Sequence, residues 1–472
     1  MALSSVSFLF LLLPVILLLY ILLPGKWRTA KNIFLTAAGL IFYAWGDGIY
    51  VLLLVGSALL NWLVGLIMHR FAGRKKPILA AAIVLNIAVL FLFKYTAMLI
   101  KTLDLIPGIE LTNPDIHLPI GISFFTFQAL SYIIDIYRDP QLTQKNFGRL
   151  LLYLSFFPKL LQGPIVKYRD FAPQLESRSE SAALVCRGIR RFAAGLSKKI
   201  LIADMLARTA DSIFGDAVLS GSCLCAWIGA LSYLGQIYFD FSGYSDMAIG
   251  LGQMFGFSLP ENFSYPYAAS GMRDFWRRWH ISLSAWFTDY VYIPLGGSRR
   301  GKLITYRNIL IVFLLTGIWH GAEYTFLIWG IFNGILVALE HSGMIPVGRG
   351  RGAWWCHIYT FFAVTVGFVI FRSPSLGAAG SYLVSMFSFH TAANGAARAL
   401  EFLSPYFIFI LFSAFVFSMP VVPWLKKKLS AAPPVLGKLA QASSYIAALV
   451  LIVLCTMSLA ADSFSPFIYT RF

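Results

Sequence analysis

Two histidines of this sequence lie beside tryptophan, and both have the chemistry needed to move a proton. His280 ends the cluster RDFWRRWH, and His320 lies in the apolar run TGIWHGA. A histidine ordinarily titrates near neutral pH, so it can take a proton from a hydroxyl and later return it. We therefore interpret His320 as a general base. The competing interpretation is a histidine that only forms a hydrogen bond to a neighbouring helix.

The residues around His320 indicate how its ring could be positioned. Gly317 and Gly321 flank the histidine and permit close approach of another part of the chain or of a ligand. Glu323 and Asn333 follow on the same or the next helix, where either could orient the imidazole. We expect the rest of this stretch, from Arg273 to Phe332, to hold His320 in place.

The position of His280 is open to two interpretations from the sequence. It heads an amphipathic stretch whose aromatic residues have the character of membrane-interface anchors. His280 therefore either faces the reacting groups or lies at the boundary of the lipid headgroups. The aromatic residues expected at that interface are Trp276, Trp279, Trp286 and Tyr290.

The composition indicates the kind of molecule that must position these side chains. Of 472 residues, 58% are hydrophobic and only 12% are charged, and apolar runs of about twenty residues recur along the chain. The sequence therefore predicts an all-α integral membrane protein that crosses the bilayer several times. The net charge of +17 suits loops that face anionic lipid better than it suits nucleic acid, which we do not expect as a partner.

Hydropathy and loop charges predict the spans and their direction. The first and third loops are basic, whereas the second and fourth carry acidic residues, among them Asp104, Glu110 and Asp115. Basic loops stay in the cytoplasm, so we expect the N-terminus outside and the first apolar segment to be a spanning helix and not a cleaved signal. The predicted spans are 6–24, 30–46, 49–69, 77–100, 306–321, 324–342, 354–371, 403–424 and 443–461.

The region from 118 to 260 has a different pattern. Proline and glycine interrupt apolar sequence near 156–164, which predicts broken or re-entrant helices. Longer helical stretches are expected over 183–214 and 223–256, and a short interfacial helix within 373–400. We expect one integral domain, residues 1–472, with its catalytic core at about 118–342.

Carboxylates inside apolar helices are costly, and they usually have a charged partner. Asp240 and Asp246 lie in the stretch YFDFSGYSDMAIGLG. The natural partners in the sequence are Arg273, Arg277 and Arg278, and the pairing could be either functional or purely structural.

The sequence lacks the motifs that are typical of several classes of enzyme. The sequence contains no phosphate-binding loop, no G-x-S-x-G and no H-E-x-x-H, so nucleotide hydrolysis and a serine-hydrolase elbow are unsupported. The five cysteines are scattered in mostly apolar surroundings, and we predict neither a disulfide framework nor a metal site.

The order of motifs along most of the chain resembles the membrane-bound O-acyltransferase family. The match is to its bacterial branch, which contains alginate O-acetylases, peptidoglycan O-acetyltransferases and teichoic-acid D-alanyl transferases. The motifs that carry the resemblance are LPIGISFFTFQALSYIIDIYR, SFFPKLLQGPIVKYRDF, QIYFDFSGYSDMAIGLGQMFGF, NFSYPY, WRRWHISLSAWFTDYVYIPLGG, TGIWHGAEYTFLIWG and SPFIYTRF.

The resemblance implies a ring of spanning helices around a central funnel or tunnel. It implies that His320 is catalytic and that His280 is the second characteristic residue. A thioester donor would approach from the cytoplasm and the acceptor from outside. Candidates for lining the donor or substrate tunnel are Trp319, Glu323, Asn333, Arg273, Arg277, Arg278, Asp240, Asp246 and Gln128.

The function implied is O-acetylation of an extracytoplasmic polysaccharide from the bacterial cytoplasmic (inner) membrane. Acetyl-CoA or an acyl carrier thioester would be the donor, with no bound cofactor or metal. The expected partners are membrane lipid, a periplasmic or extracellular acyl-transfer protein and the polysaccharide. Two alternatives stay open, a D-alanyl transferase whose carrier protein binds Arg299, Arg300 and Lys302, and an acyl or sugar transporter without chemistry.

Overall fold

The computed structural model confirms the expected fold class. It describes residues 2–104, 106, 111–112, 114, 116–348, 354–388, 393–430 and 433–461, and within these ranges the regular elements are all helices. Glu110, Asp115 and the SPFIYTRF motif (465–472) lie outside the described residues. Six described segments are long and apolar enough to cross a membrane, or seven if a bent pair counts as one span.

The chain forms two compact units, and the boundaries between them include one within α10 (Ala182–Ser197) and one within α13 (Cys223–Met254). One unit holds Met1–Phe192 and Met247–Pro260, and the other holds Ala193–Asp246 and Glu261–Phe472. The single integral domain stays a prediction. Helices of the first unit are α1 (Leu13–Leu22), α2 (Arg28–Asp47), α3 (Val51–Arg70), α4 (Lys75–Lys94), α5 (Thr96–Leu103), α6 (Ile122–Arg138), α7 (Phe147–Ser155), α8 (Phe157–Leu160), α9 (Tyr168–Glu176) and most of α10 (Ala182–Ser197).

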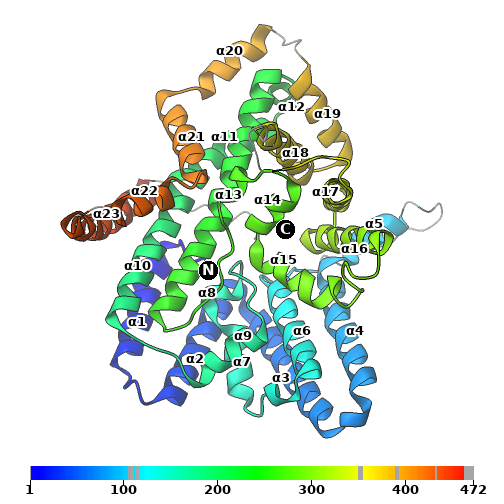
Figure 1. The fold of residues 1–472 in the computed structure, drawn as a ribbon, viewed down its shortest axis with the longest axis vertical. Helices are drawn as coiled ribbons and strands as arrows, with labels where there is room; N and C mark the ends of the chain where they lie inside the picture. The colour runs from blue at the N-terminus through cyan, green and yellow to red at the C-terminus, as the bar shows by residue number, and fades with distance from the viewer. Residues whose placement is uncertain are drawn as a thin grey trace. The chain divides into compact units, whose positions relative to one another are not determined.

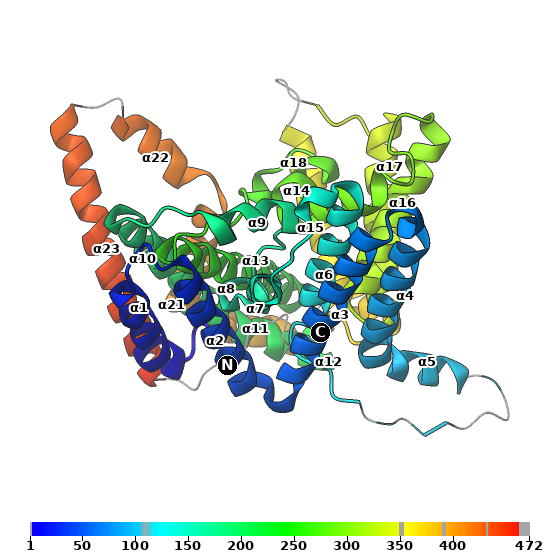
Figure 2. The same ribbon diagram turned by 90° about the horizontal axis from the view of Figure 1, so that it is seen from below.

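In the first unit, the apolar helix α6 is buried along most of its length. It packs against both α3 and α4, and the three helices can be followed in Figures 1 and 2. Between α3 and α4, the side-chain amides of Asn61 and Asn86 exchange hydrogen bonds of 3.0 and 2.9 Å. Amide pairs of this kind join helices where no water can satisfy the polar groups.

The predicted interruption after residue 155 is confirmed. α7 ends at Ser155, Phe156 is extended, and Pro158 lies in the first turn of the four-residue α8. Lys159 on α8 is fully buried, and its amine donates hydrogen bonds to Gln128 Oε1 and to the carbonyl of Tyr153. Broken backbone is tolerated in apolar surroundings when protein encloses it, as it does here.

The helices of the second unit follow the predicted pattern in most places. They are α11 (Asp204–Gly215), α12 (Ala217–Ser220), α13 (Cys223–Met254, which ends in the first unit), α14 (Met272–Arg278), α15 (Ile281–Phe287), α16 (Lys302–His320), α17 (Tyr324–Ser342), α18 (Trp354–Arg372), α19 (Leu376–Phe387), α20 (Ala393–Phe402), α21 (Pro405–Ser418), α22 (Val421–Ser430) and α23 (Pro434–Ala461).

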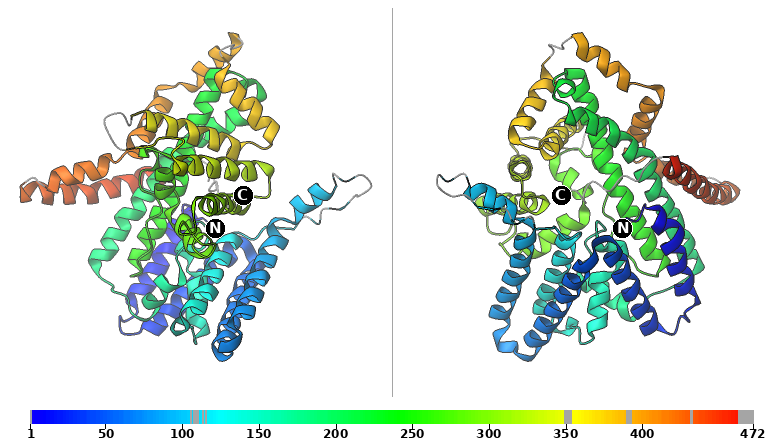
Figure 3. Two further views of the ribbon diagram at one scale, coloured as in Figure 1. Left: turned by 45° about the vertical axis from the view of Figure 1, so that its right-hand side comes forward. Right: turned by 180° about the vertical axis from the view of Figure 1, so that it is seen from behind.

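Three predictions about these segments need correction. The first apolar segment forms a shorter helix, Phe8–Leu22, than the predicted span. The span predicted over 403–424 is bent by 61° between α21 and α22. The single interfacial helix expected within 373–400 is two helices, α19 and α20. After the bend, α22 is followed by α23, and these two helices pack against each other as the orange and red pair in Figure 3.

Candidate active site

His320 is the last residue of α16, and a cage of aromatic rings surrounds it. The helix ends because Gly321 is extended, and only 4% of His320 is exposed. The rings of Trp319, Trp329 and Phe371 lie edge-on to the imidazole, with centroids 4.7, 5.0 and 5.2 Å away. The histidine is therefore held in apolar surroundings at the C-terminal end of a helix.

Glycines let α17 approach α16 closely enough to build this cage. A Cβ added at Gly317 would lie 2.5 Å from the carbonyl oxygen of Phe326, and one at Gly330 would lie 2.5 Å from that of Phe313. A Cβ at Gly321 would collide with the ring of Phe326 at 2.1 Å. The prediction that glycines beside His320 permit close approach is thus confirmed, and the approaching element is α17.

His280 occupies the break between α14 and α15. Its backbone is left-handed, with φ 44° and ψ 53°, a conformation that non-glycine residues rarely adopt. The residue is 1% exposed and its ring meets Phe241 of α13 edge-on at 4.6 Å. Of the two interpretations left open by the sequence, burial favours the one in which His280 faces the interior, since the side chain is not exposed as a headgroup anchor would be.

Trp319 brings the two histidines into one site. Its ring centroid lies 6.1 Å from that of His280 and 4.7 Å from that of His320. Two imidazoles far apart in sequence therefore contact one indole. The tryptophans expected at the membrane interface are also interior, since Trp276, Trp279 and Trp286 are all buried.

Burial determines the protonation state of His280. Removal from water lowers the pKa of His280 to about 3, because the charged imidazolium is disfavoured in the interior. The Nδ1 atom lies 3.1 Å from the side-chain oxygen of Asn262. His280 is therefore a neutral imidazole at physiological pH.

The other side chains expected near His320 have different roles. Asn333 Oδ1 accepts a hydrogen bond from Trp276 Nε1 at 3.3 Å, and its Nδ2 donates to the carbonyl of Trp329 at 2.8 Å. Asn333 thus positions the ring of Trp276 and is itself anchored to the backbone of α17. Glu323 is exposed and begins α17 as its N-cap residue.

The basic cluster on α14 points away from the buried rings. Arg273 and Arg277 are exposed, and Arg278 is half-buried with Nε 3.1 Å from Asp274. The N-terminus of α14 is held by Glu340, whose carboxylate accepts hydrogen bonds from the backbone N–H groups of Met272 and Arg273. This long-range contact was not predicted from the sequence.

The expected partners of the buried carboxylates are wrong. Asp240 pairs with Lys199 at 2.6 Å and Asp246 pairs with Lys198 at 2.6 Å, and neither pairs with the arginines of α14. Lys199 also contacts Asp204 at 2.8 Å. Both lysines come from a π-helical turn, residues 198–203, between α10 and α11. These ion pairs join α13 to the π-helical turn.

Gln128 lies in the first unit, where its side-chain oxygen accepts a hydrogen bond from Lys159. Over the ranges that the structure describes, no three histidine, cysteine, aspartate or glutamate side chains are grouped so that they could hold a metal ion. All five cysteines are free thiols.

Asn262 and Glu340 are the two polar residues of the site that sequence reasoning missed. Asn262 opens the NFSYPY motif, and both residues lie far along the chain from the groups they contact. Glu340 ends the apolar run ILVALE, and that carboxylate was the available clue, whereas Asn262 lies in a more polar stretch that offered no such signal.

Comparison with known proteins agrees with this geometry. Residues 38–345 match the model of the membrane-bound O-acyltransferase family. The chain is 42% identical over 398 residues to the probable alginate O-acetylase AlgI of Pseudomonas putida, covering 82% of this chain and 81% of that protein. It is 37% identical over 506 residues to the probable alginate O-acetylase AlgI of Azotobacter vinelandii, covering 100% of both chains.

A relative that acts on another polymer is similarly close. The chain is 37% identical over 419 residues to the peptidoglycan O-acetyltransferase of Helicobacter pylori, covering 80% of this chain and 78% of that protein. The family match includes both histidines and most of the helices around them. This multi-pass membrane protein therefore belongs to the membrane-bound O-acyltransferase family.

Proposed function

We propose that this O-acetyltransferase takes an acetyl group from a thioester on the cytoplasmic side and transfers it, across the membrane, toward an extracytoplasmic polysaccharide. The relatives named for alginate and peptidoglycan acetylation support the acetyl group and the class of acceptor. Acetyl-CoA is the proposed donor. A periplasmic or extracellular protein is the proposed partner that passes the acetyl group to the sugar.

The observation that carries the mechanism is the position of His320, buried in an aromatic cage at the C-terminal end of α16. As the acceptor hydroxyl attacks the thioester carbonyl, its proton passes to the imidazole of His320, and an oxygen–carbon bond forms. The carbon–sulfur bond then breaks, and the imidazolium returns the proton to the departing sulfur. The partial negative charge at a helix C-terminus stabilises the imidazolium in between.

The test is acetyl transfer in inside-out membrane vesicles, with labelled acetyl-CoA added at the cytoplasmic face. We expect His320→Gln to lose activity by about a hundredfold to ten-thousandfold, the usual contribution of a general base. Phe371→Leu is the matched control, since it disturbs the cage but keeps the imidazole, and we expect it to retain most of the activity.

Three outcomes would change the proposal. Full activity of His320→Gln at matched expression would reduce His320 to a packing residue. Equal losses in His320→Gln and Phe371→Leu would assign the effect to packing. Absence of transfer from acetyl-CoA in the unmodified protein, together with transfer from a charged carrier protein, would favour the D-alanyl alternative.

A further inference from the structure

Asn262 makes contacts with three consecutive residues at the break that contains His280. Its side-chain oxygen lies 3.1 Å from His280 Nδ1, its backbone oxygen accepts from Ile281 N at 3.0 Å, and its side-chain oxygen accepts from Ser282 N at 3.2 Å. Ser282 Oγ donates to the same side-chain oxygen at 2.8 Å. One asparagine therefore holds the left-handed turn together.

These contacts determine which way the amide of Asn262 points. The backbone N–H of Ser282 can only donate, so the atom that faces it must be the oxygen. The amide nitrogen then faces Ser245 Oγ, to which it donates at 3.1 Å. A flipped amide would place its NH₂ group against the N–H of Ser282, two donors facing each other.

The fixed amide in turn determines the tautomer of His280. Because an oxygen faces Nδ1, that nitrogen must carry the hydrogen and donate it. A neutral imidazole with hydrogen on Nδ1 has its lone pair on Nε2. The Nε2 atom of His280 is buried, and among the described residues it has no hydrogen-bond partner.

We propose that Asn262 is a positioning residue that locks His280 as the Nδ1–H tautomer, so that Nε2 presents a lone pair to a hydroxyl-bearing substrate. The backbone strain at His280 is consistent with this role, since left-handed non-glycine residues persist where surrounding contacts impose them. The tautomer that Asn262 imposes on His280 is a property of the protein without substrate. Only the effect of this tautomer on acetyl transfer rests on the proposed function.

The lock can be measured directly by NMR of the full chain, labelled with [¹⁵N]histidine and held in lipid nanodiscs. His280→Asn assigns the signals of this ring. We expect a protonated Nδ1 and an unprotonated Nε2 in the unmodified protein, and a mixture of tautomers in Asn262→Ala. Asn262→Asp keeps an acceptor oxygen toward Nδ1 and should restore the protonated Nδ1.

Activity provides a second readout with a matched control. We expect Asn262→Ala to lower acetyl transfer by about tenfold to a hundredfold, the range seen when an outer hydrogen-bond partner of a functional histidine is removed. Ser245→Ala removes the other contact of the amide, but Ser282 N still orients the oxygen. We therefore expect that variant to keep both the tautomer and the activity.

The inference is overturned if the unmodified protein carries its hydrogen on Nε2, or if Asn262→Ala leaves the Nδ1–H tautomer unchanged. Near-normal transfer by Asn262→Ala, with the tautomer lost and the melting temperature kept, would show that the lock has no role in activity. That last result would leave His320 and the proposed function intact, because His320→Gln tests them separately.

Discussion

At the scale of single residues, the two histidines differ in how the chain holds them. His320 is enclosed by rings, whereas His280 is held by a hydrogen bond to Asn262 and by an unusual backbone conformation. The site therefore combines an imidazole in an apolar cage with one in a polar hydrogen-bond network. Their common neighbour is Trp319.

The pH dependence of transfer can separate the two imidazoles. Burial lowers the pKa of His280 to about 3, below its ordinary value, so His280 stays neutral down to that pH and cannot cause a loss of activity near neutrality. We expect His280→Asn to lower the rate but to leave the midpoint of the acid limb of kcat/KM unchanged. A shifted midpoint in that variant would show that His280 titrates in the working range.

At the scale of helices, the crossing of α16 and α17 decides where His320 lies. Gly317 is one helical turn before His320, and it meets Gly330 at the point of closest approach. Small residues at such crossings allow the backbones to approach in membrane proteins. The cage thus depends on the small size of Gly317 and Gly330 at the helix crossing.

Gly330→Ala tests this dependence. The added Cβ would lie 2.5 Å from the carbonyl oxygen of Phe313, so the backbones must separate and the cage around His320 must open. We expect a lower melting temperature in detergent and a loss of transfer of at least several-fold. Gly380→Ala in α19 is the control, because its Cβ would meet nothing within 4 Å and alanine favours a helix. Equal behaviour of the two variants would contradict the role of the crossing.

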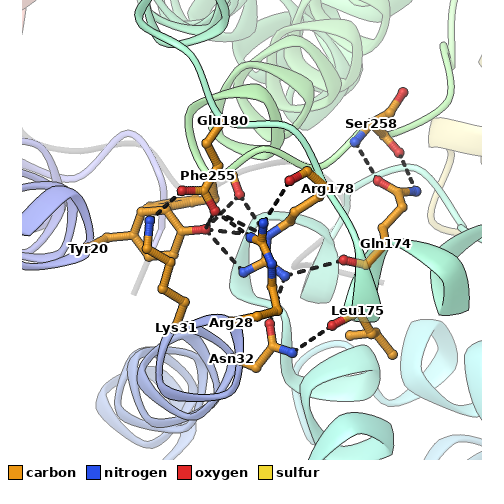
Figure 4. Close-up of polar contacts among 10 residues, drawn as sticks. All are labelled: Tyr20, Arg28, Lys31, Asn32, Gln174, Leu175, Arg178, Glu180, Phe255 and Ser258. Carbon is orange, nitrogen blue, oxygen red and sulfur yellow. Dashed lines mark hydrogen bonds and ion pairs between the residues drawn. The ribbon is translucent and has the colours of Figure 1, made fainter. Parts of the chain in front are cut away.

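At the scale of the whole molecule, segments far apart in sequence are joined by buried charge. In the first unit, Glu180 accepts hydrogen bonds from Tyr20, Arg28 and Lys31 (Figure 4). Arg178 lies beside them and donates to the carbonyl of Phe255, just beyond the end of α13. One carboxylate therefore compensates three basic side chains and connects the start of the chain with its middle.

Glu180→Gln should destabilise the fold, because it leaves three cations clustered without their carboxylate. Burial alone would raise the pKa of Glu180, but hydrogen bonds from Lys31, Tyr20 and Arg28 hold it below the ordinary value. Its contribution is therefore complete above about pH 4.3 and is lost as the pH falls through the lower folded pKa.

The measurement is the melting temperature in detergent at pH 7 and at acid pH. We expect Glu180→Gln to melt several degrees below the unmodified protein at pH 7, and the gap to shrink below about pH 4. Glu176→Gln is the control, since Glu176 is largely exposed in its pair with Arg149 and such pairs contribute little. A gap that is the same at both pH values would contradict the role of the charge.

The class of molecule and the residues most suited to chemistry could be predicted from the sequence alone. Runs of apolar residues long enough to cross a bilayer are local features, so the helices α2, α3 and α16–α18 were predictable within a few residues. The helices α4 and α23 were also expected, but α4 ends at Lys94 and α23 begins at Pro434, both well before the predicted bounds. The break at Pro158 and the glycines beside His320 were also readable, because backbone preferences are properties of individual residues.

Which distant groups meet could not be predicted from the sequence and depends on the folded structure. Asp240 and Asp246 pair with lysines of a π-helical turn and not with Arg273, Arg277 or Arg278 of α14, and Trp276 and Trp279 are buried in the second unit. The contact of Asn262 with His280 likewise depends on how the loop before α14 folds back. Apolar sequence specifies that a helix is buried or in lipid, but the packing of whole helices determines which face is which.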